Sequence, residues 1–227
     1  MITRPLDASG LEVSRIILGC GNFGGIGSAP RFFGQGESEE DANRLMDAAW
    51  ELGITVFDTA DAYGGGRSET WIGRWRERTG NDVVLSTKVF HSVEGDPRDR
   101  GLSRERILRQ IDGSLMRLGV EQVDMYLIHE PDPETPLEET LDALDDVVRA
   151  GKVRAIGASN VDRRWLEQAL GRVQWVQNSY SLLDRESEAS FGSARRGGSA
   201  SRRSARWRGG GWRAGTAAAS RLLPAPA

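Results

Sequence analysis

Four side chains that can hold, donate or stabilise a proton lie near the ends of short apolar segments. Asp58 ends one such segment and precedes Tyr63 by five residues, Lys88 ends the next segment, and His129 ends the one after that. A phenol has an ordinary pKa of about 10 and is a poor proton donor near neutrality. A nearby ammonium lowers that pKa, and a carboxylate fixes the position of the ammonium. With a histidine to orient a carbonyl oxygen, this set suits protonation of the alkoxide that hydride transfer creates.

Each of these residues taken alone also has a structural interpretation. An aspartate such as Asp58 often caps a turn, a lysine often extends its ammonium to solvent, and a lone histidine is usually structural. Lys88 is unusual because the chain has only two lysines against 28 arginines, so it is a candidate for chemistry that arginine does not perform. His91, three residues after Lys88, is a weaker candidate that we expect in a loop.

The segments that carry these residues predict a parallel β/α fold. Short apolar runs alternate with helical patterns, and the runs are almost continuously apolar, as in strands buried on both faces. The predicted strands are Arg15–Cys20, Ile54–Asp58, Val83–Lys88, Val123–His129, Val153–Ser159 and Val173–Asn178. Helices are expected after the capping residues Ser38, Ser103 and Asp162 and from Pro136 onward.

Six strands and five crossovers fit either an open doubly wound sheet or a (β/α)₈ barrel. Polar residues lie at the carboxyl ends of the strands, namely Asp58, Lys88, His129, Ser159 and Gln177. In a barrel all these ends meet at one mouth, where active sites are built, so the pattern favours an incomplete (β/α)₈ TIM barrel with about six of its eight units. Residues 4–6 and 11–13 predict a small β-hairpin before the first strand.

Five segments resemble successive motifs of the aldo-keto reductase family, in the family's order. They are FDTADAYGGGRSE, LSTKV, DMYLIHEPD, VRAIGASNV and VQNSYSLLDRE, and the resemblance covers about residues 10–186. It implies an oxidoreductase that reduces an aldehyde or ketone to an alcohol by hydride transfer from NADPH or, less often, NADH.

The resemblance also assigns roles to individual residues. It matches the catalytic tetrad, with Tyr63 as general acid, to Asp58, Tyr63, Lys88 and His129. The residues expected to bind the cofactor are Gly21, Asn22, Phe23, Asp58, Ser159, Asn160 and Gln177, of which Ser159, Asn160 and Gln177 match contacts to the nicotinamide carboxamide. No metal site is predicted.

Residues 19–24 form a G-x-G-x-x-G sequence that competes with this interpretation. A dinucleotide-binding fingerprint also needs a helix at the third glycine and an acidic residue about 20 positions later, at the end of a second strand. Here the chain continues as a loop up to Ser38. We therefore expect this loop to approach the cofactor or to shape a wall of the substrate pocket.

Bulk composition indicates one globular domain of ordinary character. The chain has 227 residues, of which 38% are hydrophobic and 28% charged, and no apolar run is long enough for a membrane span. The N-terminus lacks a secretory signal and Cys20 is the single cysteine, so we expect a reducing cytoplasm. The expected partner is a small carbonyl compound, not nucleic acid or membrane.

The composition changes near residue 189. Residues 189–227 contain eight arginines and no acidic residue, and regular periodicity ends there. The predicted domains are a partial barrel over residues 1–188 and a non-native, disordered tail over residues 189–227. A nucleic-acid-binding arginine tail is an alternative, which predicts binding that weakens steeply with salt and needs the tail.

The tail can be read as a frameshifted copy of the lost barrel sequence. Shifting the frame from Ala205 to Thr216 permits Pro-Leu-Ala-Gly-Gly-Trp-Leu-Ala-Gly-Arg-Tyr, which resembles a segment after the seventh strand in many family members. The last two barrel units, whose loops commonly hold phosphate, are then missing. We expect poor solubility and weak or undetectable NADPH binding, and a catalytically inactive barrel is the alternative function.

The nucleotide sequence from codon 180 onward tests the frameshift. We expect an insertion or deletion between about codons 184 and 199, followed by family-like sequence in the alternative frame. An intact single frame through codon 227, in independently sequenced DNA, would contradict this origin of the tail.

Overall fold

A computed structural model describes the chain except for residues 7–9, 170, 181–184, 197–199 and 205–227. Its strands are β1 (Thr3–Leu6), β2 (Leu11–Ser14), β3 (Leu18–Gly19), β4 (Val56–Asp58), β5 (Val84–Val89), β6 (Val123–Ile128), β7 (Val153–Ser159), β8 (Trp175–Ser179) and β9 (Ala200–Ser204). Its helices are α1 (Glu39–Glu51), α2 (Arg67–Thr79), α3 (Arg104–Leu118), α4 (Leu137–Arg149), α5 (Arg163–Gln168) and α6 (Glu188–Arg196), with a 3₁₀ turn at Pro30–Phe32.

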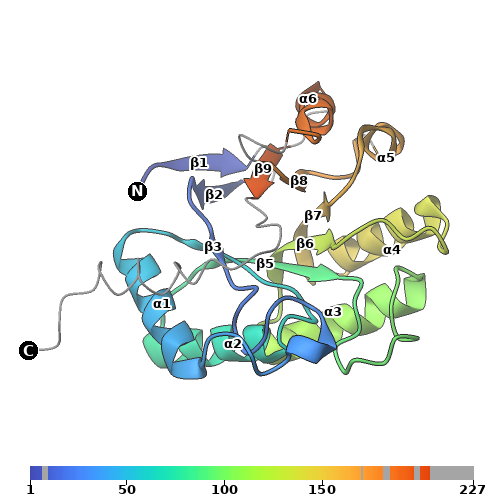
Figure 1. The fold of residues 1–227 in the computed structure, drawn as a ribbon. Helices are drawn as coiled ribbons and strands as arrows, with labels where there is room; N and C mark the ends of the chain where they lie inside the picture. The colour runs from blue at the N-terminus through green and yellow to red at the C-terminus, as the bar shows by residue number, and fades with distance from the viewer. Residues whose placement is uncertain (7–9, 170, 181–184, 197–199, 205–227) are drawn as a thin grey trace, which may run out of the picture.

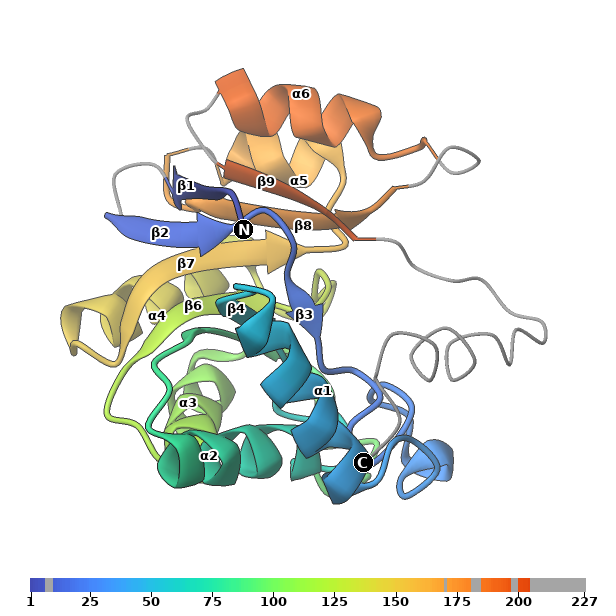
Figure 2. The same cartoon turned by 90° about the vertical axis from the view of Figure 1, so that its left-hand side faces the viewer.

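Strands β3 to β9 form one parallel sheet in sequence order, so each strand pairs with the next along the chain. A doubly wound sheet would reverse its strand order at a switch point, and this sheet does not. The sheet is curved and the helices cover its outer side (Figures 1 and 2). The incomplete (β/α)₈ barrel is thereby confirmed.

The predicted helix starts are confirmed by their capping contacts. Ser38 Oγ accepts a hydrogen bond from the Asp41 N–H at 3.1 Å, and Asp162 Oδ1 accepts one from the Trp165 N–H at 2.7 Å. Each bond satisfies a backbone donor that the first turn of a helix leaves without an intrahelical acceptor. Ser103 caps α3 in the same way.

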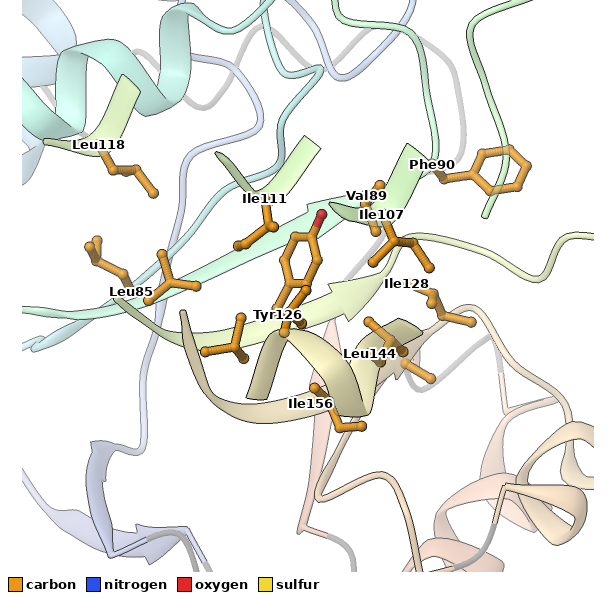
Figure 3. Packing of buried hydrophobic residues seen from close by; sticks show 14 of the residues in the cluster. Leu85, Val89, Phe90, Ile107, Ile111, Leu118, Tyr126, Ile128, Leu144 and Ile156 are labelled. Atoms are coloured by element: carbon orange, nitrogen blue, oxygen red, sulfur yellow. The ribbon is translucent and has the colours of Figure 1, made fainter. Parts of the chain in front are cut away.

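Two hydrophobic clusters lie on opposite faces of the sheet. The outer cluster packs strand residues such as Phe57 against α1 to α5. Figure 3 shows Tyr126 of this cluster close to Ile111 and Leu144. The inner cluster contains strand residues of opposite parity, such as Met125 and Leu127. Side chains alternate between the two faces along a strand. The even-numbered residues of β4 and β5 and the odd-numbered residues of β6, β7 and β8 therefore face the barrel interior.

The predicted N-terminal hairpin is present and closes the inner cluster. Strands β1 and β2 pair antiparallel, with Thr3 opposite Ser14 and Leu6 opposite Leu11. Leu6 and Leu11 are almost fully buried and pack with the inward residues of the large sheet. The hairpin therefore covers apolar surface that would otherwise face solvent at the bottom of the barrel.

Helix α6 and strand β9 lie in the part of the chain for which the sequence predicts a separate tail. Phe191 and Ala194 on α6 are buried, and Ser190 Oγ donates to the Val161 carbonyl oxygen at 3.3 Å. Strand β9 extends the sheet by pairing with β8. Regular structure thus continues past residue 189, where the predicted tail begins. The last 23 residues of that tail, 205–227, lie outside the described part of the chain. A non-native origin of the tail stays a prediction.

Among the described residues, no helix combines the length and the apolar character that crossing a membrane requires.

Truncation of Leu6 tests the packing of the hairpin. Leu6→Ala is expected to lower the free energy of unfolding by about 2–5 kcal/mol, because it removes buried methyl groups and leaves a cavity. Ile2→Ala is the matched control, since Ile2 is 60% exposed, and its effect should stay within about 0.5 kcal/mol. Urea denaturation measures both. Equal, small effects would show that the hairpin does not pack on the sheet.

Candidate active site

A buried ion pair lies at the carboxyl ends of β4 and β5. Lys88 Nζ donates to Asp58 Oδ1 at 2.9 Å and to the Thr59 carbonyl oxygen at 2.7 Å. The two charged side chains are only 1% and 5% exposed. Ser86 Oγ donates to Asp58 Oδ1 at 2.9 Å, and Gln177 Nε2 donates to Asp58 Oδ2 at 3.1 Å. Buried charges are tolerated when paired and hydrogen-bonded in this way.

Sheet register brings these groups together. Asp58 lies directly opposite Ser86 in the β4–β5 pair, and Ser159 lies opposite Gln177 in the β7–β8 pair. Lys88 is two residues after Ser86 and therefore points to the same inner face. Four strands thus contribute side chains to one interior site, although these residues are far apart in the sequence.

Tyr63 lies on the loop between β4 and α2, and backbone hydrogen bonds stabilise this loop. The Tyr63 N–H donates to the Ala60 carbonyl oxygen at 3.2 Å, and the Gly64 N–H donates to the Gly27 carbonyl oxygen at 3.2 Å. Gly64 has a φ of +59°, and an added Cβ would lie 2.5 Å from the Phe23 carbonyl oxygen. Only glycine fits this position without displacing the loop.

The Tyr63 phenol, the Lys88 ammonium and the His129 imidazole form one group. Tyr63 Oη and His129 Nε2 are 3.4 Å apart, and their rings meet edge to face with centroids 5.4 Å apart. Lys88 Nζ is 5.2 Å from the centroid of the Tyr63 ring. The predicted tetrad residues Asp58, Tyr63, Lys88 and His129 are therefore contiguous in the structure.

His129 is held at the end of β6 by its backbone. Its N–H donates to the Val89 carbonyl oxygen at 2.9 Å, and its carbonyl oxygen accepts from Asn160 Nδ2 at 2.8 Å. The ring of His91 packs edge to face on His129, with centroids 4.8 Å apart. Thus His91, the weaker sequence candidate, does lie beside the tetrad.

Ser159 ends β7, Asn160 follows it, and Gln177 lies opposite Ser159 on the neighbouring β8. The amide nitrogen of Gln177 faces the Asp58 carboxylate, which accepts and does not donate, so the orientation of the amide is determined. Gln177 Oε1 is buried and has no hydrogen-bond partner among the described residues. A buried carbonyl-type oxygen without a partner is an acceptor for an N–H donor, such as that of a carboxamide. These residues therefore fit the nicotinamide end of a cofactor.

A pocket of about 730 Å³ opens above these groups. The site residues predicted from the sequence that line it are Gly21, Asn22, Tyr63, Lys88, His129, Ser159, Asn160 and Gln177. Asp58 lies beneath Lys88, and Phe23 is 2% exposed and packs in the outer hydrophobic cluster. The cofactor roles of these residues stay predictions.

Several residues of the site were not predicted from the sequence. Ser86 was detectable, because it precedes Lys88 by two residues in a predicted strand and so shares its face. Ile26, Pro30 and Phe32 line the pocket from the loop between β3 and α1. That loop has no periodicity from which their direction is predictable.

Comparisons with known proteins identify the family of this chain. The family model described as the Aldo/keto reductase family matches residues 15–196. Aldo-keto reductase YhdN of Bacillus subtilis is 36% identical over 80% of this chain and 54% of its own length. Versiconal hemiacetal acetate reductase of Aspergillus parasiticus is 37% identical over 81% of this chain and 60% of its own.

A solved structure shows the same fold. The holo form of an aldo-keto reductase, AKR11C1 from Bacillus halodurans, superposes with a TM-score of 0.76 at 28% identity, covering 89% of this chain and 65% of that one. The chain thus spans little more than half the length of the curated relatives described above. On the family match and the identities, the chain belongs to the aldo/keto reductase family.

Proposed function

We propose that this site reduces an aldehyde or ketone to an alcohol with NADPH as the hydride donor and Tyr63 as the general acid. The observation that carries the proposal is the buried Lys88–Asp58 ion pair beneath a phenol that also contacts His129. This group lies in the same pocket as the unpartnered amide oxygen of Gln177. A candidate proton donor and a hydrogen-bond acceptor for the cofactor therefore lie in one pocket.

The chain's own residues supply the proton and the orientation. When bound, the cofactor supplies a hydride to the carbonyl carbon. Tyr63 Oη donates its proton to the carbonyl oxygen, so one hydride and one proton convert the carbonyl to an alcohol. The Lys88 ammonium stabilises the phenolate left on Tyr63, and Asp58 keeps Lys88 in position. His129, within hydrogen-bonding distance of Tyr63, orients the carbonyl oxygen.

The side chains of Ser159, Asn160 and Gln177 would hold the nicotinamide carboxamide. Asn160 has a φ of +56°, a left-handed conformation that asparagine tolerates, and its amide bonds to the His129 carbonyl oxygen and to Ser159 Oγ. Asn160 thus connects the residues proposed to bind the cofactor with His129 of the proposed catalytic group. The preference for NADPH over NADH rests on the family resemblance.

A second candidate is a barrel that keeps the site without turnover. Within the described residues, β3 and β9 each pair with one neighbour, so the sheet ends on two edges and does not close. A closed barrel surrounds its mouth with eight strand-following loops. NADPH binding without aldehyde reduction would favour this candidate over the first.

Tyr63→Phe tests the general acid. We expect kcat for aldehyde reduction to fall at least about 100-fold, because the only group lost is the hydroxyl that donates the proton. NADPH affinity and thermal stability should remain close to those of the wild type. Tyr180→Phe is the matched control, since Tyr180 Oη bonds to Glu188 and does not line the pocket, and it should keep its activity. Turnover that survives in Tyr63→Phe would exclude Tyr63 as the acid.

Gln177→Met tests the proposed hydrogen bond between the Gln177 amide oxygen and the cofactor. The substitution removes both the bond to Asp58 and the free acceptor at similar volume, and we expect about 5- to 30-fold weaker NADPH binding, the equivalent of about 1–2 kcal/mol. Tryptophan fluorescence quenching on NADPH titration measures the affinity. Gln168→Met, in a different pocket at the end of α5, serves as the control. Unchanged affinity in Gln177→Met would remove Gln177 from the cofactor site.

A further inference from the structure

A second set of buried polar groups lies on the outer face of the sheet, behind the catalytic loop. Thr87 on β5 and Tyr126 on β6 have the parity opposite to Lys88 and His129, so their side chains face the helices and not the pocket. Facing them from the loop before α2, from α2 and from α3 are Asp61, Glu69, Arg106 and Arg117. We call these six residues the outer polar cluster.

Most members of the outer polar cluster are paired. Thr87 Oγ1 donates to Glu69 Oε1 at 2.5 Å, and Arg117 Nε donates to Glu69 Oε2 at 2.7 Å. The Arg106 guanidinium donates to the carbonyl oxygens of His91 at 2.7 Å and of Asp99 at 3.1 Å. The cations of the cluster are therefore already engaged with a carboxylate or with backbone.

Asp61 and Tyr126 are the exceptions. Both residues are fully buried, and neither the Asp61 carboxyl oxygens nor the Tyr126 hydroxyl has a hydrogen bond of ordinary geometry to a described group. Apolar side chains surround the Tyr126 ring, including Ile107 and Ile111 on α3 (Figure 3). A carboxylate placed here would lack both water and a strong hydrogen-bond donor.

The surroundings of Asp61 favour its neutral form. Burial, together with the negative charge of Glu69, raises the pKa of Asp61 to about 8, although Arg106, Arg117 and the Ala62 N–H act in the opposite direction. Burial, with Asp61 and Glu69, also raises the pKa of Tyr126 well above its ordinary value. Tyr126 therefore stays a neutral phenol while Asp61 titrates.

The backbone connects Asp61 to the catalytic groups on both sides. The Asp61 N–H donates to the Lys88 carbonyl oxygen at 3.0 Å, and the Lys88 ammonium donates to the carbonyl oxygen of Thr59, two residues before Asp61. Tyr63 follows Asp61 by two residues, in the turn closed by Ala60. A displacement of the Asp61 side chain is therefore expected to move the backbone of residues 59–63, which positions the Tyr63 phenol near Lys88.

We propose that Asp61 is a positioning residue for Tyr63: its neutral carboxyl, buried in the outer polar cluster, holds the catalytic loop, and loss of its proton displaces the phenol. Ionisation creates a second negative charge beside Glu69 where solvent does not screen it, and moving the Asp61 carboxylate out of the cluster relieves this repulsion. The link to catalysis rests on the proposed function of Tyr63, but the displacement itself does not.

The titration of Asp61 has a defined effect on stability. A carboxyl with a higher pKa in the folded than in the unfolded chain binds its proton more tightly when folded, so stability is lost as pH rises between the two values. For Asp61 these are 3.8 and about 8. The melting temperature of Asp61→Asn, relative to that of the wild type, should therefore rise by several degrees from pH 5 to pH 8 and then level off.

Asp82→Asn is the matched control for this measurement, because the Asp82 side chain is 95% exposed in the connection between α2 and β5. Its melting temperature should follow the wild type across the pH range. A constant offset between Asp61→Asn and wild type at all pH values would show that Asp61 does not titrate in this range, and would overturn the proposal.

Carbon-13 NMR of the labelled tyrosine ζ carbons tests the coupling to Tyr63 directly and needs no activity. The chain has three tyrosines, and Tyr63→Phe assigns the resonance of interest. In the wild type the Tyr63 resonance should shift with a midpoint near pH 8, and Asp61→Asn should remove that transition. A transition confined to Tyr126, or one at Tyr63 that survives in Asp61→Asn, would overturn the positioning role. Either result leaves the proposed reductase function to be judged by turnover alone.

Discussion

The buried ion pair between Lys88 and Asp58 is the interaction on which the site depends. Each charge is out of water, so each needs partners, and the partners come from different strands: Ser86 on β5, Gln177 on β8 and the Thr59 carbonyl oxygen after β4. Satisfying the pair therefore fixes the register of distant parts of the sheet. The same requirement points the Gln177 amide nitrogen at Asp58 and leaves the amide oxygen without a hydrogen-bond partner among the described residues.

Alternation along the strands divides the polar groups between two faces. The buried pair of Lys88 and Asp58 lies on the interior face, and the outer polar cluster around Glu69 lies in the layer under α2 and α3. The loop that carries Tyr63 lies between them: it faces the pocket through Tyr63 and the outer layer through Asp61. The glycines at positions 64–66, all with positive φ, allow the tight course of this loop.

Sequence patterns predicted the strands and the convergence of the tetrad because both follow from local rules. Apolar runs identify strands, and parallel strands present their carboxyl ends at one mouth. The edge strand β3 is shorter than predicted, with two residues in place of six, because only Leu18 and Gly19 pair with β4. Helix α6 and strand β9 were not predicted, since small residues and arginines there give little periodicity. The outer polar cluster depends on contacts between β5, β6, α2 and α3, which no local pattern encodes.

Single-turnover reduction of an aldehyde by NADPH-loaded protein tests the central claim most directly. The informative comparison is the wild type with Lys88→Met and with the double variant Asp58→Asn/Lys88→Met, in which no unpaired charge is buried. We predict that the wild type oxidises its bound NADPH in step with alcohol formation. The double variant should regain much of the thermal stability lost in Lys88→Met and yet remain without hydride transfer. Reduction by the double variant at the wild-type rate would contradict the assignment of the ion pair to the chemistry.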